Sequence, residues 1–255
     1  MLPSLFISHG APDLVLHDLP ARRFLASYGA ELPVPRAICV VSAHYAGAMA
    51  QVTSGAAPRT VHDFGGFDAS LYTLQYPAPG APALAARIRD ACEAAGIACV
   101  ADPNGGFDHG VWCPLRLLYP AAQIPVVALS VSPRRDAAWH LALGRALAPL
   151  RAEDVLVIGS GAITHNLYEV APPAHHAEAP PWVDAFADWV EERLAARDEV
   201  ALVDWRTHGP HAADNHPSAE HLLPLHVALG AAGADWRATR LHRSVSYRAL
   251  RMDCY

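Results

Sequence analysis

Residues 154–167 read DVLVIGSGAITHNL, a short apolar run that ends in glycines and is followed by a histidine. Residues 155–158 are continuously apolar, which is typical of a strand covered on both faces of a sheet. Gly159 and Gly161 then predict a tight backbone turn, and His165 follows it. The stretch therefore predicts a buried, parallel-type strand that ends where polar chemistry begins.

The same arrangement occurs twice earlier in the chain. Residues 5–10 read LFISHG and residues 37–44 read AICVVSAH, so each apolar run carries a histidine at its end. Ligands of open α/β sheets bind beyond the carboxyl ends of the strands, so we expect His9, His44 and His165 to meet in one crevice. The predicted fold is α/β, with a central, mostly parallel or mixed β-sheet flanked by helices and a metal site at the strand carboxyl ends.

Length and composition favour a compact enzyme-sized domain. The chain has 255 residues, of which 52% are hydrophobic and 17% charged, and we expect one domain over residues 1–255. A net charge of −6 without a basic stripe disfavours binding to nucleic acid or a membrane surface. No apolar run approaches the roughly 20 residues that span a bilayer. Five cysteines without a C-x-x-C pair indicate reduced thiols, so we expect a cytoplasmic protein.

Apolar periodicity and turn residues outline the remaining elements. Helices are expected over residues 21–29, 82–95, 136–147, 182–194 and 218–230, and strands over 97–101, 124–131, 199–203 and 237–247. Long or glycine-rich loops are expected over residues 51–82 and 104–110, with a proline-rich connector over 175–181. A loop as long as the first of these is more often a lid or binding segment than a plain connector.

Histidine placement is the strongest functional signal. A lone histidine is more often hydrogen-bonded or exposed than a ligand, but three at strand ends favour a metal centre. Imidazoles from separate elements, without cysteine, are typical of catalytic sites for Zn(II), Fe(II) or Mn(II). His109 lies in the glycine-rich loop, and His221 lies in the first turn of the helix predicted at 218–230. Glu220 and His221 differ by about 100° around that helix, so either one fits as a further ligand.

Two other interpretations of the Gly-Ser-Gly stretch are weaker. A dinucleotide-binding fingerprint needs a third glycine where Thr164 stands. A nucleophile elbow needs Gly-x-Ser-x-Gly, which this stretch does not match. Among the aromatic residues, Phe64, Trp112 and Tyr45 are candidates for substrate binding, with core packing as the alternative interpretation.

Short segments spread over nearly the whole chain together carry a family resemblance. They are SHGAP at 8–12, SAHY at 42–45, VHDFGGF at 61–67, LY at 71–72 with YPAPG at 76–80, DHGVWCPL at 108–115, GSG at 159–161 with HNL at 165–167, and HPSAEHLLPL at 216–225. In this order they resemble the DODA-type (4,5-DOPA extradiol dioxygenase-like) branch of the class III extradiol ring-cleavage dioxygenases, in the LigB superfamily. Each segment is short, and their number and order make the resemblance specific.

The resemblance implies a mononuclear non-haem centre with Fe(II), and with Zn(II) as an alternative bound metal. It implies that His9, His44 and His221 hold the metal, and that His165 is either a further ligand or an acid/base. His109 is implied to act beside the substrate. The implied reaction inserts O2 into a catechol, DOPA-like or simpler, to give a muconic semialdehyde. We expect small-molecule partners only, and a monomer or small homo-oligomer.

Two rival hypotheses use the same histidines. One is a hydrolase in which Zn(II) activates water. The other is a metal-binding relative that retains the scaffold without turnover. Oxygen uptake in the presence of a catechol separates both from the dioxygenase, because neither would consume O2.

Overall fold

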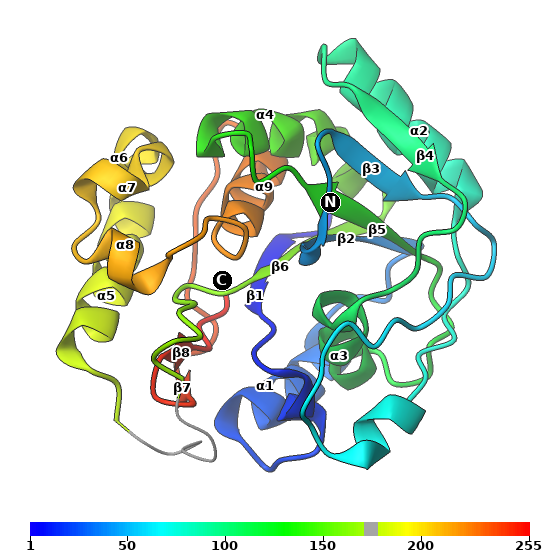
Figure 1. Cartoon of the computed structure of the whole chain (residues 1–255). Helices are drawn as coiled ribbons and strands as arrows, with labels where there is room; N and C mark the ends of the chain where they lie inside the picture. The colour runs from blue at the N-terminus through cyan, green and yellow to red at the C-terminus, as the bar shows by residue number, and fades with distance from the viewer. Residues whose placement is uncertain (171–177) are drawn as a thin grey trace.

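The computed structural model describes residues 1–170 and 178–255 and contains a six-stranded sheet (Figure 1). The strand order across the sheet is β1-β6-β2-β5-β3-β4. The strands are β1 (Ser4–Ser8), β2 (Ala37–Ala46), β3 (Ala50–Thr53), β4 (Cys99–Asp102), β5 (Val126–Val131) and β6 (Val155–Gly161). All neighbouring strands pair in parallel except β3 and β5, which are antiparallel. The predicted α/β fold with a mostly parallel, mixed sheet is confirmed.

Helices cover both faces of the sheet, and each face buries its own apolar cluster. The α-helices are α1 (Pro20–Glu31), α2 (Pro82–Ala94), α3 (His109–Leu118), α4 (Ala137–Leu147), α5 (Pro181–Ala196), α6 (Glu199–Val203), α7 (Trp205–His208), α8 (Ala212–Asn215) and α9 (Leu223–Ala232). Three 3-10 helices, η1 (Pro12–Val15), η2 (Ala69–Thr73) and η3 (Ala148–Glu153), and a hairpin of β7 (Val245–Ser246) and β8 (Leu250–Arg251) complete the described elements. Figure 1 shows α1 and α3 on one side of the sheet and α4 and α9 on the other. None of the described helices is long and apolar enough to cross a membrane.

Two of the predicted strands are wrong. Residues 199–203 form α6, whose first turn is capped by the Asp198 carboxylate, which accepts a hydrogen bond from the Ala201 backbone N–H at 3.1 Å. This local cap outweighs the short apolar alternation on which the strand was predicted. Of residues 237–247, only Val245–Ser246 form a strand, paired with β8.

The helix predicted over residues 218–230 begins later, at Leu223. The Ser218 hydroxyl donates to Glu220 Oε1 at 2.8 Å instead of capping a helix, so His221 lies in the turn that precedes α9. β3 lies almost wholly in the stretch predicted as a loop over 51–82, and α3 begins inside the loop predicted over 104–110 and continues to Leu118, so neither was predicted. The short helices α7 and α8 were not predicted either. Residues 175–177 of the predicted connector lie outside the described residues.

The buried histidine His140, on α4, makes the stability of the fold dependent on pH. Its Nδ1 donates to the Asp136 carbonyl at 2.7 Å, and its Nε2 accepts from the Ser132 backbone N–H at 3.1 Å. The ring is fully buried, and burial lowers its pKa to about 4. Protonation would therefore both place a charge in the interior and break the bond to Ser132.

We expect the free energy of unfolding to fall as the pH drops from about 6.5 to 4. The unfolded chain binds a proton on His140 below its ordinary pKa of about 6.5, whereas the folded chain resists it until about pH 4. The contribution is present in full above pH 6.5, is lost as the pH falls, and amounts to about 3 kcal/mol. Urea unfolding between pH 4 and 7 measures it, and His140→Gln should flatten the slope. An equally steep slope in His140→Gln would contradict this assignment.

Candidate metal centre and active site

Three histidine side chains converge at the carboxyl edge of the sheet. His9 directly follows β1, His44 lies near the end of β2, and His221 lies in the turn before α9. The Nε2 atom of His44 is 3.1 Å from His9 Nε2 and 3.2 Å from His221 Nε2. The strand-end histidines His9 and His44 therefore meet, as predicted, and His221 completes the cluster.

Two glycines allow the His221 segment to lie against β6. Gly159 and Gly161 are buried within the strand and pair with β1, so the predicted tight turn is wrong. A Cβ atom on Gly161 would lie 2.1 Å from the His221 carbonyl oxygen, and one on Gly159 would lie 2.2 Å from the Pro224 carbonyl oxygen. These positions need glycine because the backbone of the turn before α9 and of the first turn of α9 packs directly on the strand.

The protonation of the His9 ring follows from its neighbour Ser160. The Ser160 hydroxyl donates its only proton to the Gly110 carbonyl at 2.5 Å, so it must accept a hydrogen bond from His9 Nδ1, which lies 2.9 Å away. The proton of the His9 ring is therefore on Nδ1. Its Nε2, which faces the cluster, carries a lone pair.

Carboxylates impose the same tautomer on the other two rings. Asp63 Oδ2 lies 3.3 Å from His44 Nδ1, and Glu220 Oε1 lies 3.2 Å from His221 Nδ1. His221 Nδ1 donates to Glu220, and the negative charge of Asp63 beside His44 favours the proton of that ring on Nδ1, so each Nε2 carries a lone pair. Glu220 thus contacts the outer nitrogen of His221, whose other nitrogen faces the cluster.

The three inward lone pairs fit a divalent cation. Lone pairs of neutral imidazoles about 3 Å apart repel one another unless a cation lies among them. Burial lowers the pKa of His44 to about 3, and burial and the neighbouring histidines lower those of His9 and His221 well below their ordinary value. The rings are therefore neutral at neutral pH, as metal ligands must be, and each Nδ1 bond supplies the outer contact usual for ligating histidines.

Two further histidines, His109 and His165, flank this cluster. The ring of His109, the first residue of α3, lies 3.8 Å from the ring of His44 between centroids. The His165 ring stacks on that of His221 at 3.4 Å. The His165 backbone N–H donates to the Asn215 carbonyl at 2.9 Å, and burial lowers the pKa of its ring to about 4. Both side chains border a cavity and can exchange protons with a molecule held there.

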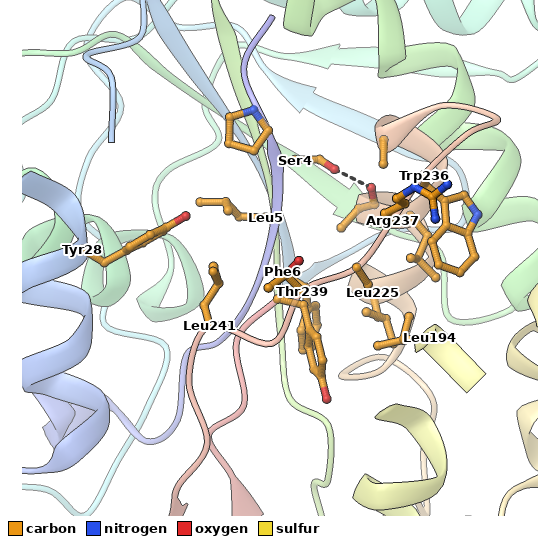
Figure 2. Close-up of a pocket in the computed structure, with 16 residues that line it drawn as sticks. Ser4, Leu5, Phe6, Tyr28, Leu194, Leu225, Trp236, Arg237, Thr239 and Leu241 are labelled. Carbon is orange, nitrogen blue, oxygen red and sulfur yellow. Dashed lines mark hydrogen bonds between the residues drawn. The ribbon is translucent and has the colours of Figure 1, made fainter. Parts of the chain in front are cut away.

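The cavity beside the cluster has a volume of about 980 Å³. The histidines His44, His109, His165 and His221 form its floor, and Phe64 lies in its wall. A second cavity of about 180 Å³ lies between β1 and α9, and Figure 2 shows side chains such as Leu5, Leu225 and Trp236 around it. Among the described residues, no histidine, aspartate or glutamate side chain lines the smaller cavity, so the chemistry belongs to the larger one.

Phe64 is the predicted aromatic contact that the structure brings to the cavity. Trp112 is fully buried, and its Nε1 donates to the Val61 carbonyl at 3.1 Å, so it packs beneath the Phe64 loop. Tyr45 points its hydroxyl away, donating to Asp102 Oδ2 at 2.8 Å, and does not line the cavity. Trp112 and Tyr45 therefore support the walls, contrary to the expected substrate contact.

The sequence analysis missed Asp63 and Ser160, which hold the outer nitrogens of two rings. Both lie inside the quoted motifs, VHDFGGF and GSG, but neither has a spacing that reveals its partner. Only the tertiary arrangement places Asp63 beside His44 and Ser160 beside His9.

Comparison with known proteins agrees with this geometry. Residues 22–251 match the family described as the catalytic LigB subunit of aromatic ring-opening dioxygenase. The chain belongs to the LigB family. As a LigB-family protein of the DODA type, it is an aromatic ring-opening dioxygenase.

Relatives resemble the chain over most of its length. It is 42% identical over 245 residues to a 4,5-DOPA dioxygenase extradiol of Beta vulgaris, covering 94% of this chain and 91% of the relative. It is also 42% identical over 235 residues to a protein of the same name from Escherichia coli K12, covering 90% and 85%. A crystal structure titled as an uncharacterized protein from Escherichia coli K12 superposes with a TM-score of 0.82 at 34% identity, covering 100% of this chain and 98% of the other.

Proposed function

We propose that the chain is a mononuclear non-haem Fe(II) extradiol dioxygenase that inserts O2 into the ring of a catechol. The observation that carries the proposal is the set of three inward Nε2 lone pairs, from His9, His44 and His221, beside a large cavity that His44 and His221 line. These three residues would hold Fe(II), which would supply open coordination positions for the two catechol oxygens and for dioxygen. Zn(II) also fits three imidazoles, so a zinc-loaded preparation would not argue against iron as the active metal.

The two histidines that flank the cluster, His109 and His165, move protons. A catechol must lose protons to chelate a metal, and a neutral imidazole at the cavity floor accepts one at neutral pH. His109 and His165 are placed for this role, and burial holds the pKa of His165 at about 4, so its ring is neutral at pH 7. The same imidazole can then return the proton as the catechol ring opens to a muconic semialdehyde. We assign His165 to acid/base chemistry because its ring stacks on that of His221 and is not part of the group formed by His9, His44 and His221, although it also lies near Glu220 and His221 in a second group of metal-binding side chains.

The cavity accommodates more than a bare catechol ring. Its 980 Å³ leaves room for a substituent, and several relatives are named for 4,5-DOPA. We therefore propose a substituted, DOPA-like catechol as the substrate class, with simpler catechols as weaker substrates. A cytoplasmic location and a monomeric or small homo-oligomeric state are part of this proposal. All five cysteines are free thiols, which suits a reducing compartment.

Oxygen consumption tests the proposal. Protein reconstituted anaerobically with Fe(II) should consume O2 with DOPA and catechol and form a yellow semialdehyde, whereas zinc-loaded protein should not. No uptake across a panel of catechols would reject the proposal, and hydrolytic turnover by the zinc form would favour the rival hydrolase.

Replacing His165 by alanine should lower kcat by about 10²–10⁴-fold, the usual contribution of a positioned acid/base. The variant should keep one metal per chain, measured by elemental analysis, because the three inward nitrogens remain. His208→Ala, which changes an exposed histidine on α7, is the control and should leave kcat unchanged. Loss of the metal from His165→Ala would instead make His165 a ligand.

A further inference from the structure

One carboxylate, that of Asp63, lies between two histidines with different proposed roles. Its Oδ2 is 2.9 Å from His109 Nδ1 and 3.3 Å from His44 Nδ1. Its Oδ1 accepts a hydrogen bond from the His109 backbone N–H at 2.9 Å. A single side chain thus contacts one of the three inward-facing rings and one ring proposed to move protons.

The contact with Asp63 determines which nitrogen of each ring carries the proton. An ionised carboxylate only accepts hydrogen bonds, so His109 must donate from Nδ1 to Oδ2, and the negative charge of the same oxygen, 3.3 Å from His44 Nδ1, favours the proton of His44 on that nitrogen. The nitrogen that carries the proton is set by the hydrogen bond that the ring makes. Both rings therefore keep a lone pair on Nε2. The Nε2 atom of His44 faces those of His9 and His221.

The second oxygen of Asp63 positions the backbone that carries His109. His109 is the first residue of α3, where a backbone N–H lacks a partner within the helix. The preceding carboxylate, Asp108, does not cap the helix and instead accepts from the Ser42 hydroxyl at 2.6 Å. Asp63 fills this place from a distant part of the chain, and a negative charge at a helix N-terminus is favourable.

We propose that Asp63 is a positioning residue for both halves of the reaction, holding His44 in the tautomer that binds the metal and His109 in the tautomer that accepts the substrate proton. The reaction itself is the one given under the proposed function, on which this inference rests. The role is shared because one oxygen serves both rings, so a single substitution should disturb metal binding and proton transfer together.

Asparagine is the informative replacement. Its side chain has almost the same shape but no negative charge, and its amide group presents protons where Oδ1 or Oδ2 accepted from the backbone or the ring of His109. The ring of His44 or of His109 must then rotate or move its proton to Nε2. Asp68→Asn is the matched control, because Asp68 borders the same cavity while its carboxylate accepts from Ser70.

Tautomers can be observed directly, without turnover. Long-range 1H–15N correlation spectra of histidine-labelled, metal-free protein should show His109 protonated on Nδ1, with the signal assigned by its disappearance in His109→Gln. In Asp63→Asn the Nε2-protonated form should appear for His109 or His44, and in Asp68→Asn it should not. Unchanged tautomers in Asp63→Asn would overturn the proposal.

Metal binding gives a second readout that is independent of activity. Titration of metal-free protein with Zn(II) should show an affinity 10–100-fold lower in Asp63→Asn than in the wild type, as for other groups that orient metal-bound histidines. Asp68→Asn should bind within twofold of the wild type. Should Asp63→Asn fail to fold, Asp63→Glu, which keeps both oxygens on a longer arm, should bind Zn(II) less tightly than the wild type. Wild-type affinity in the folded variant would reject the positioning role.

Turnover separates this inference from the proposed function. With Fe(II) saturating, Asp63→Asn should lower kcat at least tenfold with little change in KM, and should lower it much less when His109→Gln is already present. If the wild type consumes no O2, the proposed function fails, while the tautomer and Zn(II) measurements still decide the role of Asp63.

Discussion

Replacing His44 by alanine should lower the affinity for a divalent metal by several hundredfold and abolish ring cleavage. His44 is the central member of the cluster, because its Nε2 lies 3.1 Å from that of His9 and 3.2 Å from that of His221. A complete structural zinc site is worth about 10–16 kcal/mol, so one ligand accounts for about 3–4 kcal/mol, which corresponds to several hundredfold in affinity. The remaining two rings cannot enclose the cation.

Isothermal titration with Zn(II) measures this effect, and thermal unfolding supports it. Metal that binds only the folded state raises the melting temperature, so the wild type should be stabilised by added Zn(II) and His44→Ala should not. His62→Ala is a suitable control, because His62 lies outside the three-ring cluster with its Nε2 bonded to the Leu74 carbonyl. Equal affinities of His44→Ala and wild type would remove His44 from the site.

The proximity of His9 and His44 was predictable because both follow continuous apolar runs, which are typical of buried parallel strands. Parallel strands have their carboxyl ends at the same edge of the sheet, so residues that follow two such strands lie close together in space. His221 was different, since its position on a predicted helix did not decide whether His221 or Glu220 is the further ligand. The structure shows a turn at this point, with His221 Nε2 in the cluster and Glu220 on its outer nitrogen, so the helical geometry did not apply.

The glycines of β6 show why local patterns mislead within a buried sheet. Gly159 and Gly161 were interpreted as turn residues, but both lie in the strand, and they are glycines because the backbone at the start of α9 and in the turn before it leaves no room for a Cβ atom. Such a close approach depends on what packs against the strand, which the local pattern does not report. The same reason applies to Trp112, whose burial under the Phe64 loop follows from the placement of α3.

Replacing Arg251 by leucine should destabilise the fold by about 3–5 kcal/mol, the usual cost of leaving a buried charge without its partner. Arg251, on β8, is 1% exposed, and its guanidinium lies 3.0 Å from Asp253 Oδ2 and also bonds to Asp184. Asp253 is fully buried, so without Arg251 its carboxylate must either stay charged in the interior or take up a proton.

Urea unfolding measures the loss, and Arg240→Leu is the matched control. Arg240 pairs with Glu191 in a partly exposed position, where an ion pair is worth at most about 1 kcal/mol. Adding Asp253→Asn to Arg251→Leu should recover part of the stability, since it removes the unpaired charge. Similar losses in Arg251→Leu and Arg240→Leu would show that burial of this pair carries no special cost.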